Sequence, residues 1–151
     1  MPTITDYHGL IRDAIATTLR GLGIGVAVSV VDEPDDMFAL EMPCIGLACV
    51  GPEQDREDWG TNIQDGRGYP VAIALLQGGT TRGEKDPGVI TATQFRRLIT
   101  TTFSNKRLTG VSQVGFCEVS DSGPIWDEKN PRYQKILTAM VVTGVGKFPR
   151  S

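Results

Sequence analysis

The residues best suited to acid–base or metal chemistry are one histidine and three cysteines, spread over the 151-residue chain. A hydrolytic triad would depend on His8 alone, because no other histidine is present to activate a nucleophile. Cys44 and Cys49 lie five residues apart in a strand-like run, so a regular strand would direct them to opposite faces. Together with Cys117 they lack the close pairing of structural zinc sites. We therefore predict reduced, buried thiols, with no catalytic residue and no metal site.

Two acidic segments, residues 32–36 and 53–58, carry carboxylates that could bind a hard cation. Neither segment has the spacing, the central glycine and the terminal glutamate of a calcium-binding loop, so we interpret both as solvated loops. A basic cluster surrounds the second predicted helix. The sequence does not decide between a contact with a partner and a solvated helix face for this cluster. Its members are Arg96, Arg97, Lys106 and Arg107.

The stretch GRGYPVAIALL (residues 66–76) raises the question of a phosphate-binding loop. Such a loop delivers a helix N-terminus to the anion, but here an apolar run follows the glycines directly. The sequence instead predicts that Gly66 and Gly68 are a flexible approach to a strand that has Pro70 at its first position. We therefore predict no cofactor.

Periodic apolar residues define two helices. The first carries a stripe from Tyr7 to Leu22, with Thr3 or Thr5 as its cap and the glycines of residues 21–25 as its end. The second begins after Thr91 or Thr93. Its stripe consists of Phe95, Leu98, Ile99 and Phe103.

Strands are predicted at residues 26–31, 44–50, 70–76, 111–119 and 136–145. Polar connections are predicted at residues 51–68, 77–88 and 120–133. Strands gathered in runs between helices favour an α+β fold, in which one mostly antiparallel β-sheet packs against two α-helices and carries long polar loops. The expected core residues are Val28, Val30, Ile45, Leu47, Ile73, Leu75, Val114, Phe116, Leu137, Ala139, Val141, Ile11, Ile15, Leu19, Phe95, Leu98 and Ile99.

Length and composition predict a single domain over residues 1–151. The net charge of −3 argues against a general nucleic-acid binder. No apolar run reaches the roughly 20 residues of a membrane-spanning helix, and the N-terminal residues lack the pattern of a signal peptide. We therefore expect that the protein does not associate with a membrane. We expect it to be assembled in the cytoplasm of the cell that makes it.

The order and spacing of these elements resemble the tail terminator (tail-completion) proteins of long-tailed bacteriophages. An amphipathic helix leads into GIGVAVSVVDEP, and the strand MPCIGLACV precedes NIQDGRGYPVAIALL, which contains Asn62, Asp65 and the Tyr69-Pro70-Val71 step. The C-terminal YQKILTAMVVTGVGKFPR is similar to the closing strand of these proteins with its basic end.

The resemblance implies a structural virion protein of the head–tail junction rather than an enzyme. Such a protein forms a ring, typically a hexamer, on the last ring of tail tube protein, ends tube polymerisation and presents a surface to the head–tail connector proteins. DNA passes through the lumen without specific binding. Another neck or head-completion protein, or a small α+β enzyme or ligand-binding domain, remains the alternative.

A ring subunit needs loops that reach its neighbours, and residues 51–68 are the expected assembly element. Trp59 is the expected anchor there, because aromatic side chains dominate interface energetics. The candidate interface residues are Asp55, Glu57, Trp59, Arg82, Lys85, Trp126 and Arg132.

Overall fold

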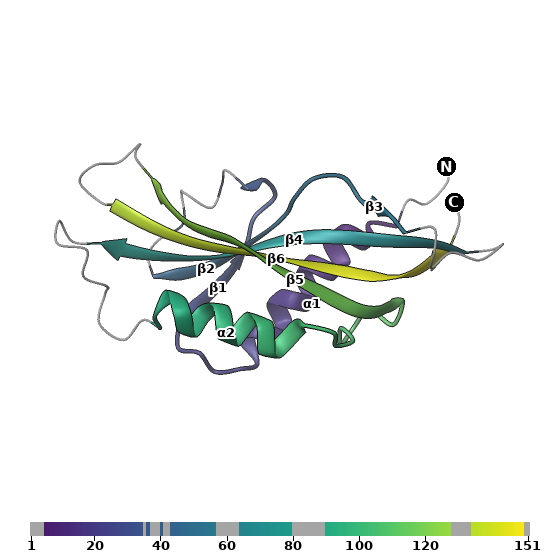
Figure 1. The fold of residues 1–151 in the computed structure, drawn as a ribbon, viewed down its shortest axis with the longest axis horizontal. Helices are drawn as coiled ribbons and strands as arrows, with labels where there is room; N and C mark the ends of the chain where they lie inside the picture. The colour runs from purple at the N-terminus through teal and green to yellow at the C-terminus, as the bar shows by residue number, and fades with distance from the viewer. Residues whose placement is uncertain are drawn as a thin grey trace.

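The computed structural model describes residues 5–34, 36, 40, 43–56, 64–79, 90–127 and 134–149. Its elements follow the order α1 (Tyr7–Arg20), β1 (Ala27–Val30), β2 (Cys44–Cys49), β3 (Gln54–Asp55), β4 (Gln64–Gly79), α2 (Ala92–Phe103), β5 (Val114–Asp127) and β6 (Gln134–Pro149). The predicted combination of helices with a mostly antiparallel sheet is confirmed, because the described residues form two helices and a six-stranded sheet of this kind (Figure 1). The strand order is β1-β2-β4-β6-β5, with β3 beside β4, and only β1 and β2 are parallel.

The first helix begins at a cap that we predicted wrongly. Asp6, and not Thr5, is the N-cap, and its Oδ1 accepts a hydrogen bond from the Gly9 backbone N–H at 2.9 Å. Asp6 directly precedes the first helical residue, whereas Thr5 lies one position too early to reach the free N–H groups. The predicted end at the glycines is confirmed, because Gly21 is the C-cap and Gly23 has a φ of 65°.

The second helix begins with a capping box at Thr91, which decides between the two predicted caps. The Thr91 hydroxyl accepts from the Gln94 backbone N–H at 3.0 Å, and Gln94 Oε1 accepts from the Thr91 backbone N–H at 2.8 Å. This reciprocal pair satisfies two N–H groups that the first turn leaves free. The helix therefore starts at a defined residue and presents Phe95 and Ile99 to the core.

Three strands run further than predicted. β4 extends from Gln64 to Gly79 and pairs with β6 over its whole length. The predicted polar connections are therefore wrong for residues 64–68 and 77–79, and also for residues 120–127, which belong to β5. These polar and glycine-rich residues have weak strand propensity of their own, but a paired neighbour satisfies their backbone groups.

Pro70 lies inside β4 and not at its beginning, which corrects the predicted strand start. Its carbonyl accepts hydrogen bonds from the Val50 backbone N–H at 3.1 Å and from His8 Nε2. This edge of β4 changes partner here, because the last pair with β2 is Cys49–Val71 and the first pair with β3 is Gly68–Gln54. Proline lacks an N–H to donate, so it fits the one place where this edge has no strand partner.

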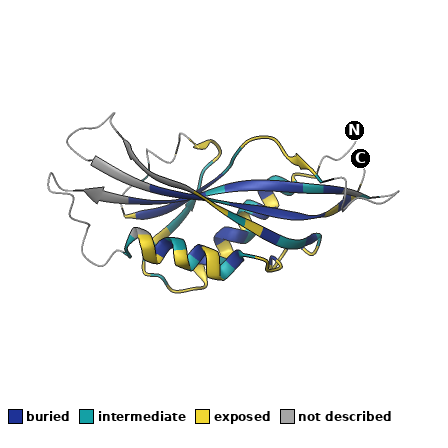
Figure 2. Cartoon of the chain, in the orientation of Figure 1, coloured by how far each residue is buried: buried dark blue, intermediate teal, exposed yellow. Residues whose placement is uncertain are grey.

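The main core lies between the two helices and one face of the sheet, where the strands are dark blue in Figure 2. Eleven of the predicted core residues are buried, including Ile11, Ile73 and Phe95. Five are only half-buried, namely Val28, Val30, Leu98, Phe116 and Val141, and the side chain of Leu137 lies outside the described residues.

A β-bulge explains why Phe116 was chosen wrongly. The pairing of β5 with β6 shifts between Val114 and Phe116. The alternation therefore changes there, and Val114 and Cys117 both belong to the helix-facing core. In β6 the residues on that face are Met140 and Val142, so Val141 points to the other face.

Candidate assembly surface

Two of the predicted interface residues, Asp55 and Trp126, lie in described strands, and they are far apart. Asp55 is exposed in β3, opposite Arg67 of β4. Trp126 of β5 lies opposite Ile136 of β6, and Ile136 in turn pairs with Gln77 of β4. The side chain of Trp126 lies outside the described residues. The ten residues of β4 between these two levels correspond to about 33 Å at strand spacing. The other candidates, Glu57, Trp59, Arg82, Lys85 and Arg132, fall outside the described residues.

The sheet is apolar on both faces, although the helices pack on only one. Opposite the main core, a second buried cluster consists of Ala48, Ala74, Leu76 and Ala139, with Val31, Leu40 and Ala72 packed against it. No residue of α1 or α2 belongs to this second cluster, and both helices lie on the other side of the sheet (Figure 1). We call this side the second face. Such runs of apolar residues are typical of strands that are covered on both sides.

The glycines predicted as a hinge have a different role on the second face. A Cβ at Gly68 would lie 3.1 Å from Thr143 Cγ2 and 3.2 Å from Gln54 Oε1. The missing side chain leaves room for Gln54 and Arg56 to lie against β4. From there the Arg56 guanidinium reaches β5 and donates to both carboxylate oxygens of Glu118, at 3.1 and 2.7 Å. This bidentate pair holds the β3 segment against the sheet.

A basic hollow of about 520 Å³ lies between α2 and β5. It is lined by Arg96, Arg97, Thr100, Thr101, Val119, Asp121 and Met140. Arg96 Nε is 3.0 Å from Asp121 Oδ2, whereas Arg97 is exposed. Residues 90–113 contain four basic and no acidic side chains. We call this site the basic hollow. Because Arg96 and Arg97 line a hollow, this part of α2 differs from an evenly solvated helix face.

An acidic turn follows β1 at the opposite edge of the sheet. It contains Asp32, with a side chain that is 97% exposed, and the exposed Glu33 and Asp36. The Glu33 backbone N–H donates to Asp36 Oδ2 at 3.2 Å, and the Asp36 N–H donates to the Glu33 carbonyl at 3.0 Å. The turn is therefore closed by its own hydrogen bonds, and the carboxylates of Asp32 and Glu33 are exposed.

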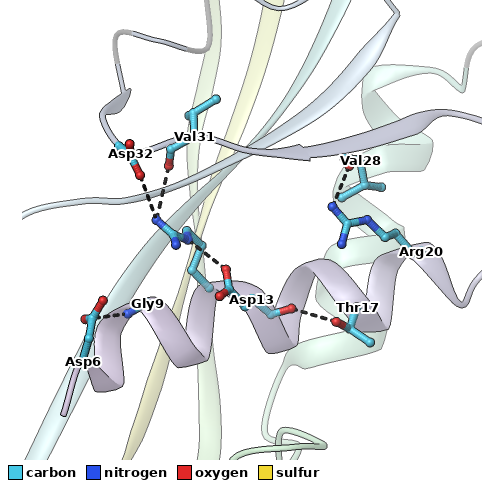
Figure 3. A network of polar contacts seen from close by, with 9 residues as sticks. Asp6, Gly9, Asp13, Thr17, Arg20, Val28, Val31 and Asp32 are labelled. Atoms are coloured by element: carbon cyan, nitrogen blue, oxygen red, sulfur yellow. Dashed lines mark hydrogen bonds and ion pairs between the residues drawn. The ribbon is translucent and has the colours of Figure 1, made fainter.

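Helix α1 holds this edge through two arginines (Figure 3). Arg12 Nη1 lies 3.4 Å from the Val31 carbonyl oxygen and 4.0 Å from Asp32 Oδ1. Arg20 Nη2 donates to the Val28 carbonyl at 3.0 Å (Figure 3). These bonds tie a carbonyl of β1 and the residue just after it to α1, next to the exposed acidic side chains.

His8 lies at the start of α1, as predicted, within an aromatic cluster. Its ring centroid is 5.5 Å from that of Tyr69, which packs edge-on against Phe148 at 4.8 Å. Burial raises the pKa of Tyr69, and a hydrogen bond to Glu53 raises it further. Tyr69 is therefore a neutral hydrogen-bond donor at physiological pH.

Within the residues that the structure describes, no three histidine, cysteine or acidic side chains are grouped as metal ligands.

The three cysteines are free thiols. The predicted placement of Cys44 and Cys49 on opposite faces of the sheet is confirmed. Cys49 pairs with Val71 of the main core, whereas Cys44 pairs with Leu76 of the second face. Cys44 and Cys117 are buried, and Cys49 is half-buried. Burial raises the pKa of Cys117 to about 11 and also raises the pKa of Cys49.

We expect the native protein at pH 8 to expose at most one thiol to Ellman's reagent, and denaturant to expose all three. Thiolate is the reactive form, and a raised pKa keeps the folded thiol protonated. Because the folded pKa of Cys117 exceeds its ordinary value of 9.0, the stability it contributes is complete below pH 9 and is lost as the pH rises through about 11. Rapid native reaction of two or three thiols would contradict this burial.

Comparison with known proteins adds no relative to this description. No protein-family model matches the chain, and the search of curated proteins found no match. Of the helices within the described ranges, none is both long and apolar enough to cross a membrane.

Proposed function

We propose that this chain is a structural subunit of a phage head–tail junction, a tail terminator that forms a ring on the end of the tail tube. The observation that carries the proposal is an apolar pair on the second face, Ala72 of β4 and its partner Val141 of β6, which are only half-buried and lie on the side of the sheet opposite the helices. A two-layer domain that acts alone usually has a polar outer face. Apolar side chains that stay partly accessible on such a face favour a subunit that is built into an assembly.

The arrangement of one β-sheet against two helices suits a ring subunit. One sheet packed against two helices gives a rigid body, and the connections between its long strands supply contacts to neighbours above, below and beside it. The ring, with six copies as the resemblance implies, would stop polymerisation of the tail tube protein and present a surface to the connector proteins. With a net charge of −3, the subunit would let DNA pass through the lumen without specific binding, in a virion assembled in the host cytoplasm.

Deleting part of the expected assembly element, residues 51–68, would not separate a loss of assembly from a loss of folding. Residues 54–64 include β3, Arg56 and the first residue of β4. Deleting them would remove a sheet pairing and the Arg56–Glu118 ion pair, in addition to any contact with a neighbour. A change of one side chain on the second face separates assembly from folding.

Val141→Arg is such a change, because Val141 is only half-buried on the second face. When the purified protein is added to polymerising tail tube protein, we expect the wild type to give short tubes with a ring at one end in electron micrographs. We expect Val141→Arg to give long tubes without rings, because a charge cannot be buried in an apolar contact without a partner. Thr17→Arg, at an exposed position of α1, should behave as the wild type and serves as the control.

Circular dichroism and thermal melting establish that each variant is folded. Tubes of unchanged length in the presence of wild-type protein would contradict the terminator function. Rings that bind connector proteins without limiting the tubes would instead identify another neck component.

A further inference from the structure

We infer that copies of the chain associate head to tail, with the acidic turn of one copy (Asp32, Glu33 and Asp36) seated in the basic hollow of the next. This inference rests on the proposed ring and names the contact between its adjacent subunits. It commits to one occupant of the hollow, a second copy of this chain.

The two surfaces lie at opposite ends of one row of residues across the sheet. The acidic turn begins two residues after Val30, and Asp121 lines the basic hollow. The pairing registers connect them in the order Val30, Leu47, Ile73, Met140 and Asp121. Four strand spacings separate the ends of the row by about 19 Å. Displacing a copy across its strands therefore brings its acidic turn toward the hollow of its neighbour.

The hollow offers groups that bind carboxylates. Arg97 is exposed beside it, and no described residue forms an ion pair with it. Thr100 and Thr101 add hydroxyl donors to the same lining. Guanidinium and hydroxyl donors together give charge-assisted hydrogen bonds to a carboxylate. Val119 and Met140 supply an apolar part of the surface.

The turn offers carboxylates that are already positioned. Two hydrogen bonds hold Glu33 and Asp36 together within one copy, and Asp32 and Glu33 are exposed. The two surfaces differ in charge. Asp32, Glu33 and Asp36 are exposed acidic residues of the turn, whereas residues 90–113 hold four basic and no acidic side chains, with Glu118 and Asp121 following in β5.

A contact between two different surfaces of identical subunits produces a ring when the rotation between copies closes. The alternative occupant, a nucleic-acid backbone, is disfavoured by the net charge of −3 of the chain, because binding to many phosphates requires a basic surface.

A charge exchange tests the contact. Arg97→Glu changes the hollow, Glu33→Lys changes the turn, and the double variant restores opposite charges between adjacent copies. We expect each single variant to weaken self-association by about tenfold or more in sedimentation velocity at low salt, because like charges then face each other. The double variant should recover most of this loss. Arg107→Glu has the same charge change outside the lining of the hollow and should associate as the wild type.

The outcomes separate this inference from the proposed function. If the wild type forms rings and both single variants form equally stable ones, the contact is wrong and the ring stands. If the wild type stays monomeric at all concentrations, the ring fails and the contact fails with it. If Arg97→Glu weakens binding to a duplex oligonucleotide but not self-association, the hollow is a phosphate site and the inference is overturned. All three positions are exposed, and circular dichroism checks that the variants fold.

Discussion

Phe95→Ala should lower the free energy of unfolding by about 3–5 kcal/mol, the range for truncating a buried aromatic side chain. Phe95 is 0% exposed and belongs to the cluster that joins α2 to the sheet, with Ile99, Ile73 and Leu75. Its removal leaves a cavity between two layers that cannot close without moving the helix. Urea unfolding of the wild type and the variant measures the difference.

Leu98→Ala provides the matched comparison, because Leu98 is on the same helix but only half-buried. We expect it to cost less than the Phe95 variant, since it loses less buried area and leaves a more open site. A Phe95→Ala variant within about 1 kcal/mol of the wild type would mean that α2 does not pack on the sheet, because such a small loss is typical of surface positions.

Gly146→Ala should destabilise the fold by about 3 kcal/mol or more, because the added methyl group meets backbone and not a side chain that can move. A Cβ at Gly146 would lie 1.9 Å from the carbonyl oxygen of Gln113 and 2.8 Å from its carbonyl carbon. The same oxygen accepts a hydrogen bond from the Lys147 backbone N–H at 3.3 Å. The substitution must therefore separate the chain before β5 from β6, and thermal melting measures the loss.

Gly21→Ala is the control for the loss of a glycine. Gly21 has a φ of −71° and the nearest atom to a Cβ there is 3.5 Å away, so alanine fits without strain. We expect its stability to stay within about 0.5 kcal/mol of the wild type or to rise slightly. Equal stability of Gly146→Ala and the wild type would show that residues 112–114 do not pack against β6.

The sequence predicted the elements whose residues carry their own signal. The stripe of Phe95, Ile99 and Phe103 and the cap at Thr91 specify α2 locally, and its observed start agrees. The lengths of β4 and β6 could not be predicted in this way. Gly66 and Gly78 have weak strand propensity, and they are in the sheet because β6 pairs with them over its whole length.

The candidate surface was predictable only in its parts. The sequence identifies the basic cluster at Arg96 and Arg97 and the acidic residues 32–36 as separate charge runs. Their alignment depends on the strand order, since β5 follows α2 in the chain but lies at the sheet edge opposite β1. Local spacing contains no information on that order. The bulge after Val114, which changes the face of β5, was hidden for the same reason.

The mass of the purified protein in solution tests the central claim most directly. Native mass spectrometry at increasing protein concentration, with electron microscopy of the same samples, measures both the number of copies and their arrangement. The account predicts a closed assembly with a mass several times the 16.3 kDa of one chain, six times for a hexamer, and rings with an open lumen. A protein that remains at 16.3 kDa at every concentration and forms no rings with tail tube protein would contradict it.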